Sequence, residues 1–326
     1  MNTKYDYENK IKQLSSIAIS LFVVAVFLLP VCYITGWFSK SAEIFFIILI
    51  VSMVVIGIAL LFRESAYKKE LELFEVKELQ RINTMRIEQE ERKARERTEL
   101  INLLNNIPKA DIDISDNKIK NNAVKDMGEI KYSRPRNGQP LSKYSSFVVV
   151  DIETTGIKVT EKIVEISAIR YDGFKPISAF TTLLDPEKPI PPEASKINNI
   201  TDDMVDGKPT FKSIIPSLER FIGNSNLVGQ NLMFDLKFLY KYGYDFTCVD
   251  RKYYDTLDIA KSKLTKYDYR KDNDPDYYYD VDDYKLSTLC EYYNVHQINA
   301  HRALGDCLAT AQVFERMLRQ EYNLKR

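Results

Sequence analysis

Two long stretches without a charged residue lie close together near the beginning of the chain. They run from Ile17 to Phe38 and from Ile44 to Phe62. Each is about long enough to cross the hydrocarbon core of a bilayer as a helix. The first is too long for the apolar core of a signal peptide, and no small-residue cleavage pattern follows it. Because two such stretches in tandem are rare among the core helices of soluble domains, the pattern predicts a transmembrane hairpin over residues 1–63.

Positive charges at the outer ends of this hairpin predict its orientation. They are Lys4, Lys10 and Lys12 before the first stretch and Arg63, Lys68 and Lys69 after the second. The connection from Ser39 to Glu43 contains Lys40 alone. Since Lys and Arg accumulate on the cytoplasmic side of membranes, we expect the N-terminus and everything after residue 63 to be cytoplasmic. The lipid bilayer is therefore an expected partner, contacted by two spans.

The segment 64–106 is predicted to be a charged helical stalk. It is dense in Glu, Lys and Arg and contains neither glycine nor proline. Apolar residues share one helical face, but Glu78 interrupts them and no heptad repeat is sustained. A solvated spacer is therefore favoured over a surface for weak self-association. The following segment, 107–145, has a mixed polar composition that includes Pro108, Pro135, Gly138 and Pro140, which is typical of a flexible linker.

Composition narrows the chemistry of the remaining part, residues 146–326. The chain of 326 residues carries no net charge, so nucleic-acid binding would depend on local patches and on metal rather than on a global basic field. Four cysteines without a C-x-x-C pair and two histidines argue against a zinc site and a disulfide framework.

A run of β-branched residues from Phe147 predicts a buried strand that ends in two acids, Asp151 and Glu153. Side chains alternate across a strand, so these two carboxylates project from the same face. Two like charges on the core side of a sheet are costly unless a cation neutralises them, and Mg²⁺ or Mn²⁺ prefers such oxygen ligands. The alternative is a strand that runs into a polar turn with both acids in water. Gly156, just beyond, allows a sharp turn or a close approach to a ligand.

The periodicity that follows predicts an α/β domain with a mixed sheet. Two further strands, 163–171 and 176–184, follow through short turns and suggest an antiparallel meander. The pattern then changes to helices, with a short strand at 226–229. The predicted helices cover residues 211–222, 232–242, 255–263, 286–293 and 303–321. A meander followed by β–α units implies a mixed sheet with helices on its faces.

Two further constellations contain an acid near a predicted helix start. Asn231 is a plausible N-cap that would place Asp235 in the first turns of the helix, where a carboxylate is also a common surface residue. His301 and Asp306 are five residues apart and would not share a helical face. They converge only if His301 lies on the loop before the helix. His301 is then either a solvated loop residue or a general-base candidate.

Together these pieces resemble the DEDD-type 3′–5′ exonucleases, specifically the histidine-bearing DEDDh branch, which includes the proofreading epsilon subunit of bacterial replicative polymerases. The resemblance covers roughly residues 146 to 320. It rests on Asp151-Ile-Glu153-Thr-Thr-Gly, Gly229-Gln-Asn231-x-x-Phe234-Asp235 and His301-Arg-Ala-Leu-Gly-Asp306. Each motif is weak to moderate by itself, but their joint occurrence in the right order is a strong signal.

The resemblance implies a ribonuclease H-like fold and a role for each matched residue. Asp151, Glu153, Asp235 and Asp306 would hold two divalent cations, Mg²⁺ or Mn²⁺, and His301 would take the proton from the attacking water. Thr154, Thr155, Gly156 and Asn231 would receive the 3′-terminal nucleotide. Two metal ions can stabilise both the attacking and the leaving oxygen of a phosphodiester displacement.

Two features depart from the family pattern. Gln230 stands where the family often has histidine. The segment 262–284 is unusually long and rich in tyrosine, where Tyr277, Tyr278 and Tyr279 either stack on single-stranded bases or pack down in a solvated loop. The acidic residues nearby favour the solvated loop.

We therefore expect a membrane-tethered, metal-dependent 3′–5′ exonuclease. Its partners would be 3′ ends of single-stranded DNA or RNA, with DNA favoured, and a proofreading role would need a separate polymerase partner. The alternatives are a catalytically silent nucleic-acid-binding or adaptor module on a membrane stalk, and a membrane scaffold whose hairpin and stalk assemble partners.

Overall fold

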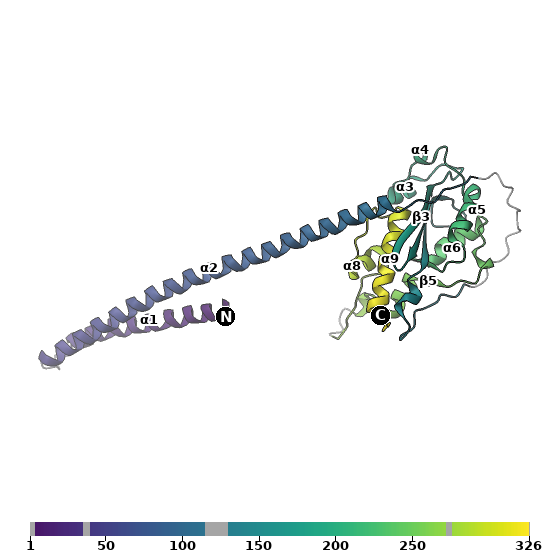
Figure 1. Ribbon diagram of the computed structural model, residues 1–326. Coiled ribbons are helices and arrows are strands. Elements are labelled where there is room, and N and C mark those ends of the chain that lie inside the picture. The colour runs from purple at the N-terminus through teal and green to yellow at the C-terminus, as the bar shows by residue number, and fades with distance from the viewer. Residues whose placement is uncertain (1–3, 35–39, 115–129, 272–275, 326) are drawn as a thin grey trace. The chain divides into compact units, whose positions relative to one another are not determined.

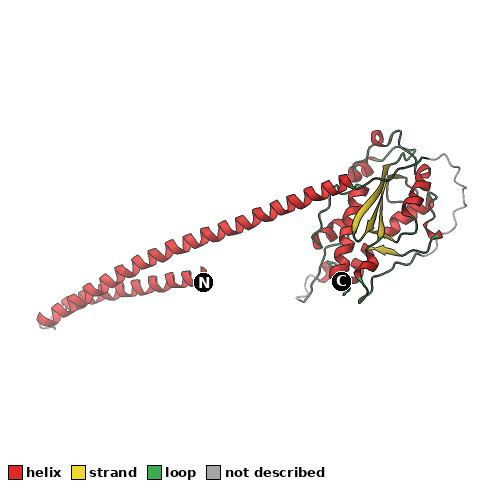
Figure 2. Ribbon diagram, in the orientation of Figure 1, coloured by secondary structure: helices red, strands yellow, loops and turns green. Residues whose placement is uncertain are grey.

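The computed structural model describes residues 4–34, 40–114, 130–271 and 276–325. The chain divides into two compact units, Met1–Ala94 and Arg95–Arg326, which are described separately. Figures 1 and 2 show long helices in the first unit and strands flanked by helices in the second. The helices are α1 (Lys4–Ile34), α2 (Lys40–Asn106), α3 (Pro192–Asn198), α4 (Asp202–Val205), α5 (Phe211–Ile222), α6 (Leu232–Lys241), α7 (Thr256–Lys263), α8 (Leu286–Tyr292) and α9 (Ala303–Gln320). The strands are β1 (Phe147–Thr154), β2 (Ile163–Asp172), β3 (Lys175–Leu183), β4 (Leu227–Gly229) and β5 (Tyr253–Asp255).

In the first unit, α1 lies antiparallel against the first part of α2. The ring of Tyr7 lies 6.5 Å from Tyr67 and 6.1 Å from Phe74, and Lys4 Nζ lies 2.7 Å from a carboxylate oxygen of Glu75. Many apolar side chains of this unit are exposed. A hairpin of this kind therefore presents apolar surface outward rather than burying it.

One stretch of helix in the described residues, Ile47–Asn106, is long and apolar enough to cross a membrane by length and composition. It includes most of the second predicted span. Residues 35–39, which contain the end of the first predicted span, lie outside the described residues. The first span and the cytoplasmic orientation remain predictions.

The second unit is built on a five-stranded mixed sheet in the order β3-β2-β1-β4-β5. The three strands of the predicted meander, β1, β2 and β3, pair antiparallel. β4 and β5 join parallel to β1 on its other side. This mixed sheet with flanking helices fits a ribonuclease H-like exonuclease fold. Among the described elements, β5, α3 and α4 were not anticipated from the sequence.

Alternate residues of β1 face two separate cores, because successive side chains of a strand point to opposite faces of the sheet. Val148 and Val150 pack with α5 and α6. Phe147 and Val149 pack with α7, α8, α9 and the end of α2. The helices thus cover both faces of the sheet. Asp151 follows the alternation of Val149, which directs it to the α9 side.

The described parts of segment 107–145 are bound to the sheet rather than detached from it as a flexible linker would be. Next to β3, Ala110 N donates to Ala179 O, and Ala179 N donates to Pro108 O, both at 2.8 Å. Just before, Leu104 and Ile107 are buried in the core beneath α9. An edge strand exposes unpaired backbone groups, and this segment satisfies those of Ala179 on β3.

The same segment also covers the opposite edge of the sheet. Ser133 N donates to Tyr253 O of β5 at 2.7 Å. Further on, Gly138 N and Leu141 N donate to carbonyls near the C-terminus, on Asn323 and Lys325. Residues 115–129 lie outside the described residues. These residues are part of the predicted flexible linker, and the residues on both sides of them belong to the second unit.

Candidate active site

The carboxyl end of β1 supplies the first two acids of the site. Asp151 and Glu153 are half-buried and are separated by the buried Ile152. In the antiparallel register, Glu153 lies opposite Glu165 of β2, so a third acid from a neighbouring strand faces the same region. Glu165 is only 4% exposed. Sequence reasoning missed it, although pairing of the two predicted strands across their short connection would have placed these glutamates side by side.

Helix α9 supplies the acid that completes a close cluster. Asp306 lies in its first turn and is 8% exposed. Carboxylate oxygens of Asp151, Glu153 and Asp306 all lie within 4.8 Å of one another. Oxygen atoms at such separations can share one hard divalent cation.

Asp235 approaches this cluster from the other side of β1. It lies in the first turn of α6 and is 3% exposed. Its Oδ1 accepts a hydrogen bond of 3.0 Å from Ile152 N, between the two acids of the strand. Asp235 is not one of the three acids whose oxygens lie within 4.8 Å of one another, yet its charge raises the pKa of Asp151. All four predicted acids thus converge, three of them closely.

Burial and mutual repulsion raise the pKa values of all four acids. Burial, followed by the charges of Asp235 and Asp306, raises the pKa of Asp151 well above its ordinary value. Burial likewise raises the pKa of Asp235 well above its ordinary range and brings the pKa of Glu153 to about 8. The pKa of Asp306 is also raised by burial, although hydrogen bonds oppose the shift. An added cation would favour the ionised forms of all four.

Arg302 supplies positive charge next to this cluster through its ion pair with Glu165. Its guanidinium binds both carboxylate oxygens of Glu165, with Nη2 at 2.8 Å from Oε1 and Nε at 3.1 Å from Oε2. Ala303 N, at the start of α9, donates to Glu165 Oε2 at 3.0 Å. Arg302 also lowers the pKa of Glu153, against the larger effect of burial. The pair therefore attaches the start of α9 to β2 and neutralises one of the five carboxylates.

His301 lies on the loop directly before α9, as convergence with Asp306 requires. Its backbone is left-handed, with φ of 61°, and its side chain is exposed. His301 N donates to Asp306 Oδ2 at 3.1 Å, and Gln297 Nε2 donates to Oδ1 at 2.7 Å. The hydrogen bond of His301 to the acids is therefore through its backbone, while its side chain is exposed to solvent and its charge lowers the pKa of the Asp306 carboxyl.

Gly305 is required where α9 lies against this loop. A Cβ added there would lie 2.1 Å from Ile298 O and 3.1 Å from Asn299 O. Both neighbours are backbone atoms, which cannot rotate away. A side chain at this position would therefore push apart the loop that carries His301 and the helix turn that carries Asp306.

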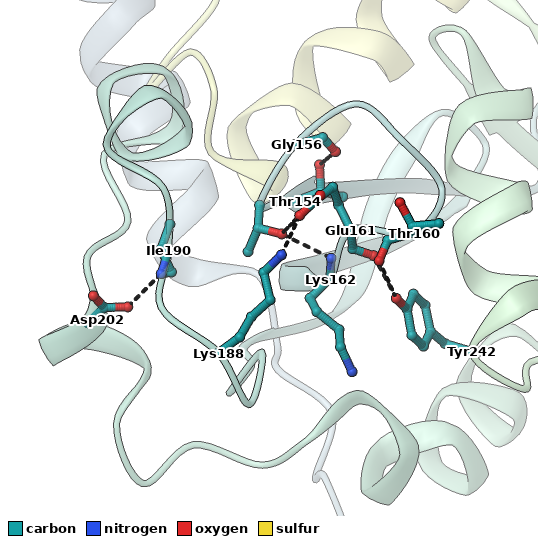
Figure 3. Close-up of polar contacts among 10 residues, drawn as sticks. Thr154, Gly156, Thr160, Glu161, Lys162, Lys188, Ile190, Asp202 and Tyr242 are labelled. Atoms are coloured by element: carbon teal, nitrogen blue, oxygen red, sulfur yellow. Dashed lines mark hydrogen bonds and ion pairs between the residues drawn. The ribbon is translucent and has the colours of Figure 1, made fainter.

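The turn after β1 is held by its own hydroxyl groups (Figure 3). Thr154 Oγ1 donates to Gly156 O at 2.8 Å, and Thr155 Oγ1 donates to Glu161 Oε2 at 2.7 Å. Lys188 forms an ion pair with the same Glu161 carboxylate. A Cβ at Gly156 would lie 3.1 Å from Glu161 Cγ. Both threonine hydroxyls therefore fix the loop beside the acids in this structure.

Asn231 occupies the predicted N-cap of α6, but its side chain makes no capping hydrogen bond. Its backbone is left-handed, with φ of 56°, and its side chain is exposed. The neighbouring Gln230 is held inward, because its Nε2 donates to Tyr284 O at 2.8 Å and its Oε1 accepts from Thr256 Oγ1. Gln230 thus ties α6 to the tyrosine-rich segment and is not directed at the acids.

The described part of segment 262–284 combines packed and exposed rings. Tyr277 Oη donates to Lys266 O, and its ring lies 6.0 Å from that of Tyr279. Tyr278 is 73% exposed. Residues 272–275 lie outside the described residues. These contacts fit a solvated loop with some rings packed down, and stacking of the tyrosines on bases stays a prediction.

Comparison with known proteins places this site in a family. Residues 148–314 match the family model of the exonucleases, RNase_T. The chain belongs to this exonuclease family. The matched range contains all four acids and His301, whereas residues 95–147 of the second unit lie outside it.

Curated relatives are replicative polymerase proteins. The chain is 32% identical over 183 residues to a PolC-type DNA polymerase III of Caldanaerobacter subterraneus subsp. tengcongensis, over 55% of this chain and 12% of that protein. It is 45% identical over 100 residues to a DNA polymerase III subunit epsilon of Treponema pallidum, over 30% of this chain and 46% of that protein. The chain thus spans less than half the length of either relative.

Solved structures that match part of this chain include two exonucleases. Exonuclease X in complex with 5′ overhanging duplex DNA is 23% identical with a TM-score of 0.38, over 54% of this chain and 93% of that one. Exonuclease I of E. coli in complex with a dT13 oligonucleotide is 18% identical with a TM-score of 0.42, over 54% and 42% of the two chains.

Proposed function

We propose that this exonuclease is a metal-dependent 3′–5′ exonuclease that acts on single-stranded ends and releases 5′-mononucleotides. The observation that carries the proposal is the convergence of Asp151, Glu153 and Asp306 within 4.8 Å, with Asp235 bound to the backbone between the first two. Buried like charges repel, so such a cluster without a cation is unfavourable. Because the chain belongs to the exonuclease family, we assign to this cluster the hydrolysis of phosphodiester bonds.

The residues fit two divalent cations, Mg²⁺ or Mn²⁺. Carboxylate oxygens are the ligands that these hard ions prefer. Of the five carboxylates, the pair with Arg302 occupies Glu165, which leaves Asp151, Glu153, Asp235 and Asp306 as the ligand set. When bound, the ions would supply positive charge to the phosphate oxygens that become more negative during the displacement.

The chain's own residues would handle the proton and the substrate. His301, exposed beside Asp306, would accept the proton of a water whose oxygen attacks the phosphorus of the last phosphodiester. The bond from phosphorus to the 3′-oxygen of the preceding nucleotide breaks, and that oxygen leaves with a proton as the new 3′-hydroxyl. Gln297 and the His301 backbone N–H would hold the Asp306 carboxylate during this step.

The 3′-terminal nucleotide would lie against the turn after β1 and the start of α6. Thr154, Thr155 and Gly156 would contribute backbone groups, because both threonine hydroxyls already hold the turn. Asn231 would contribute its exposed side chain. We favour DNA over RNA, since the curated relatives are named as DNA polymerase proteins.

We also infer that the enzyme is tethered to a membrane by a two-span hairpin, with its catalytic unit in the cytoplasm. Support comes from the two uncharged stretches, from the lysine and arginine residues that flank them, and from apolar side chains such as Phe22, Ile47 and Val55, all more than half exposed. The stalk would serve as a solvated spacer.

Hydrolysis of labelled oligonucleotides by the full chain in detergent micelles tests the proposed reaction. With Mn²⁺, a 5′-labelled single strand should shorten stepwise and a 3′-labelled one should release a 5′-mononucleotide at once. Asp151→Ala should lose activity by at least about 100-fold, whereas Asp203→Ala, at an exposed acid of α4, should retain it. Cleavage from the 5′ end, or equal activity of Asp151→Ala, would refute the proposal, and binding without cleavage would favour a silent binding module. Matched DNA and RNA strands determine the preferred sugar.

A further inference from the structure

Helix α6, which carries Asp235, begins without a capping side chain of its own. The first backbone N–H groups of any helix lack partners within that helix. At Asn231 the usual solution is missing, because its side chain makes no capping hydrogen bond. Because Asp235 lies in this first turn, the way in which the turn is fixed determines where its carboxylate lies.

Asp255, at the end of β5, caps part of the turn from outside. Its Oδ1 accepts a hydrogen bond of 2.9 Å from Asn231 N, and its Oδ2 accepts one of 3.1 Å from Leu232 N. The same carboxylate accepts a hydrogen bond from Leu257 N at the start of α7. Asp255 is 2% exposed, so this carboxylate needs its hydrogen bonds to remain ionised.

Tyr132 supplies the next partner from a distant part of the chain. Met233 N donates to Tyr132 Oη at 3.0 Å. The hydroxyl also forms a side-chain hydrogen bond with Asp255. A tyrosine hydroxyl can accept one hydrogen bond and donate another, so it can accept from Met233 and donate to the carboxylate. The tyrosine thus completes a cap that Asp255 begins.

The segment around Tyr132 is fixed independently of α6. Ser133 N pairs with Tyr253 O on the edge of β5. Arg134 binds both carboxylate oxygens of Asp258 on α7, at 2.7 and 2.8 Å. These contacts of Ser133 and Arg134 fix the backbone next to Tyr132. The whole segment lies before the residues that match the exonuclease family model.

We propose that Tyr132 is a positioning residue for the metal site, because its hydroxyl fixes the first turn of α6 and thereby the Asp235 carboxylate. The functional enzyme then includes this upstream segment as well as the family-matched part. The role in metal binding rests on the proposed function, whereas the role in capping α6 does not.

Tyr132→Phe and Tyr144→Phe form a matched pair for the test. The hydroxyl of Tyr144 also accepts a backbone hydrogen bond, from Arg136 N at 3.1 Å, but Tyr144 packs in the other core, away from α6. Both variants remove one hydroxyl and keep the ring. A difference between them therefore reports the location of the hydroxyl and not the general loss of a hydrogen bond.

Site-resolved hydrogen–deuterium exchange of the full chain in detergent, without metal, tests the cap. Tyr132→Phe should speed exchange of the Met233 amide roughly tenfold, while Tyr144→Phe should leave it unchanged. An unchanged Met233 amide in Tyr132→Phe, or the same increase in both variants, overturns the inference.

Titration with Mn²⁺, followed by electron paramagnetic resonance, tests the link to the metal site. Tyr132→Phe should weaken binding by about tenfold relative to the parent and to Tyr144→Phe. Equal affinity in all three proteins overturns the positioning role. Failure of the parent itself to bind Mn²⁺ contradicts the proposed function instead, and the exchange experiment then still decides whether Tyr132 caps α6.

Discussion

Replacement of Glu153, a proposed metal ligand, by glutamine should stabilise the metal-free protein. Burial, then the charges of Asp306 and Glu165, raises the pKa of the Glu153 carboxyl from an ordinary value of 4.5 to about 8. An acid with a raised folded-state pKa contributes stability below its unfolded pKa, and this contribution is lost as the pH rises toward the folded value. The parent should therefore become less stable between pH 5 and pH 8 when metal is absent.

The size of this effect follows from the two pKa values. At pH 7 the unfolded carboxyl is ionised and the folded one is mostly protonated, so folding is disfavoured by about 3 kcal/mol from this group. At pH 5 the corresponding cost is about 1 kcal/mol. Glu153→Gln stays neutral in both states. Its stability relative to the parent should therefore increase by about 2 kcal/mol between these pH values.

Urea unfolding of the full chain in detergent with a chelator, followed by near-ultraviolet circular dichroism of the tyrosines, measures this difference. Glu193→Gln, at an exposed acid of α3, is the matched control and should behave as the parent. The raised pKa of Glu153 is contradicted if Glu153→Gln is no more stable than the parent at pH 7, or if both lose stability equally from pH 5 to pH 8.

Three further predictions concern the loop, the buried ion pair and the metal. Gly305→Ala should lower the free energy of unfolding by about 2 kcal/mol or more and reduce nuclease activity, because the added Cβ would lie 2.1 Å from Ile298 O. The control Gly207→Ala lies at a φ of 65° with no atom within 4 Å of its Cβ. It should lower the free energy of unfolding by about 1 kcal/mol and leave activity intact. Arg302→Gln should lower the free energy of unfolding by about 3 kcal/mol, because it leaves the buried Glu165 carboxylate without its ion pair. An unchanged urea midpoint of unfolding would contradict this. Mn²⁺ at about 100 times its dissociation constant should stabilise the parent by about 3 kcal/mol, and Asp151→Ala should show little of this gain in the same assay.

The meander and the acids of the site were predictable because they depend on local patterns. A run of β-branched residues predicts β1, and alternation of apolar and polar residues predicts β2. The two-residue period of a strand also predicts that Asp151 and Glu153 share a face. The five-residue spacing of His301 and Asp306 required a loop before the helix, and the structure has one. These inferences need only the period of the element that carries each residue.

Features that depend on distant pairing were not predictable in the same way. The cap of α6 joins Met233 to Tyr132, which is 101 residues earlier, and Asn231 to Asp255, which is 24 residues later. Strand β5 has only three residues, and its partner residues in β4 lie about 26 positions earlier in the chain. The segment 107–145 has the composition of a linker, but its backbone finds partners on the two edge strands of the sheet.

Anomalous diffraction from a crystal of the full chain soaked in Mn²⁺ shows directly whether the four acids bind two metal ions. We expect two manganese peaks about 4 Å apart, bound by carboxylate oxygens of Asp151, Glu153, Asp235 and Asp306, with the His301 imidazole facing the same space. Manganese bound elsewhere, or no ordered manganese among these four carboxylates, would contradict the claim that this site is a two-metal exonuclease centre.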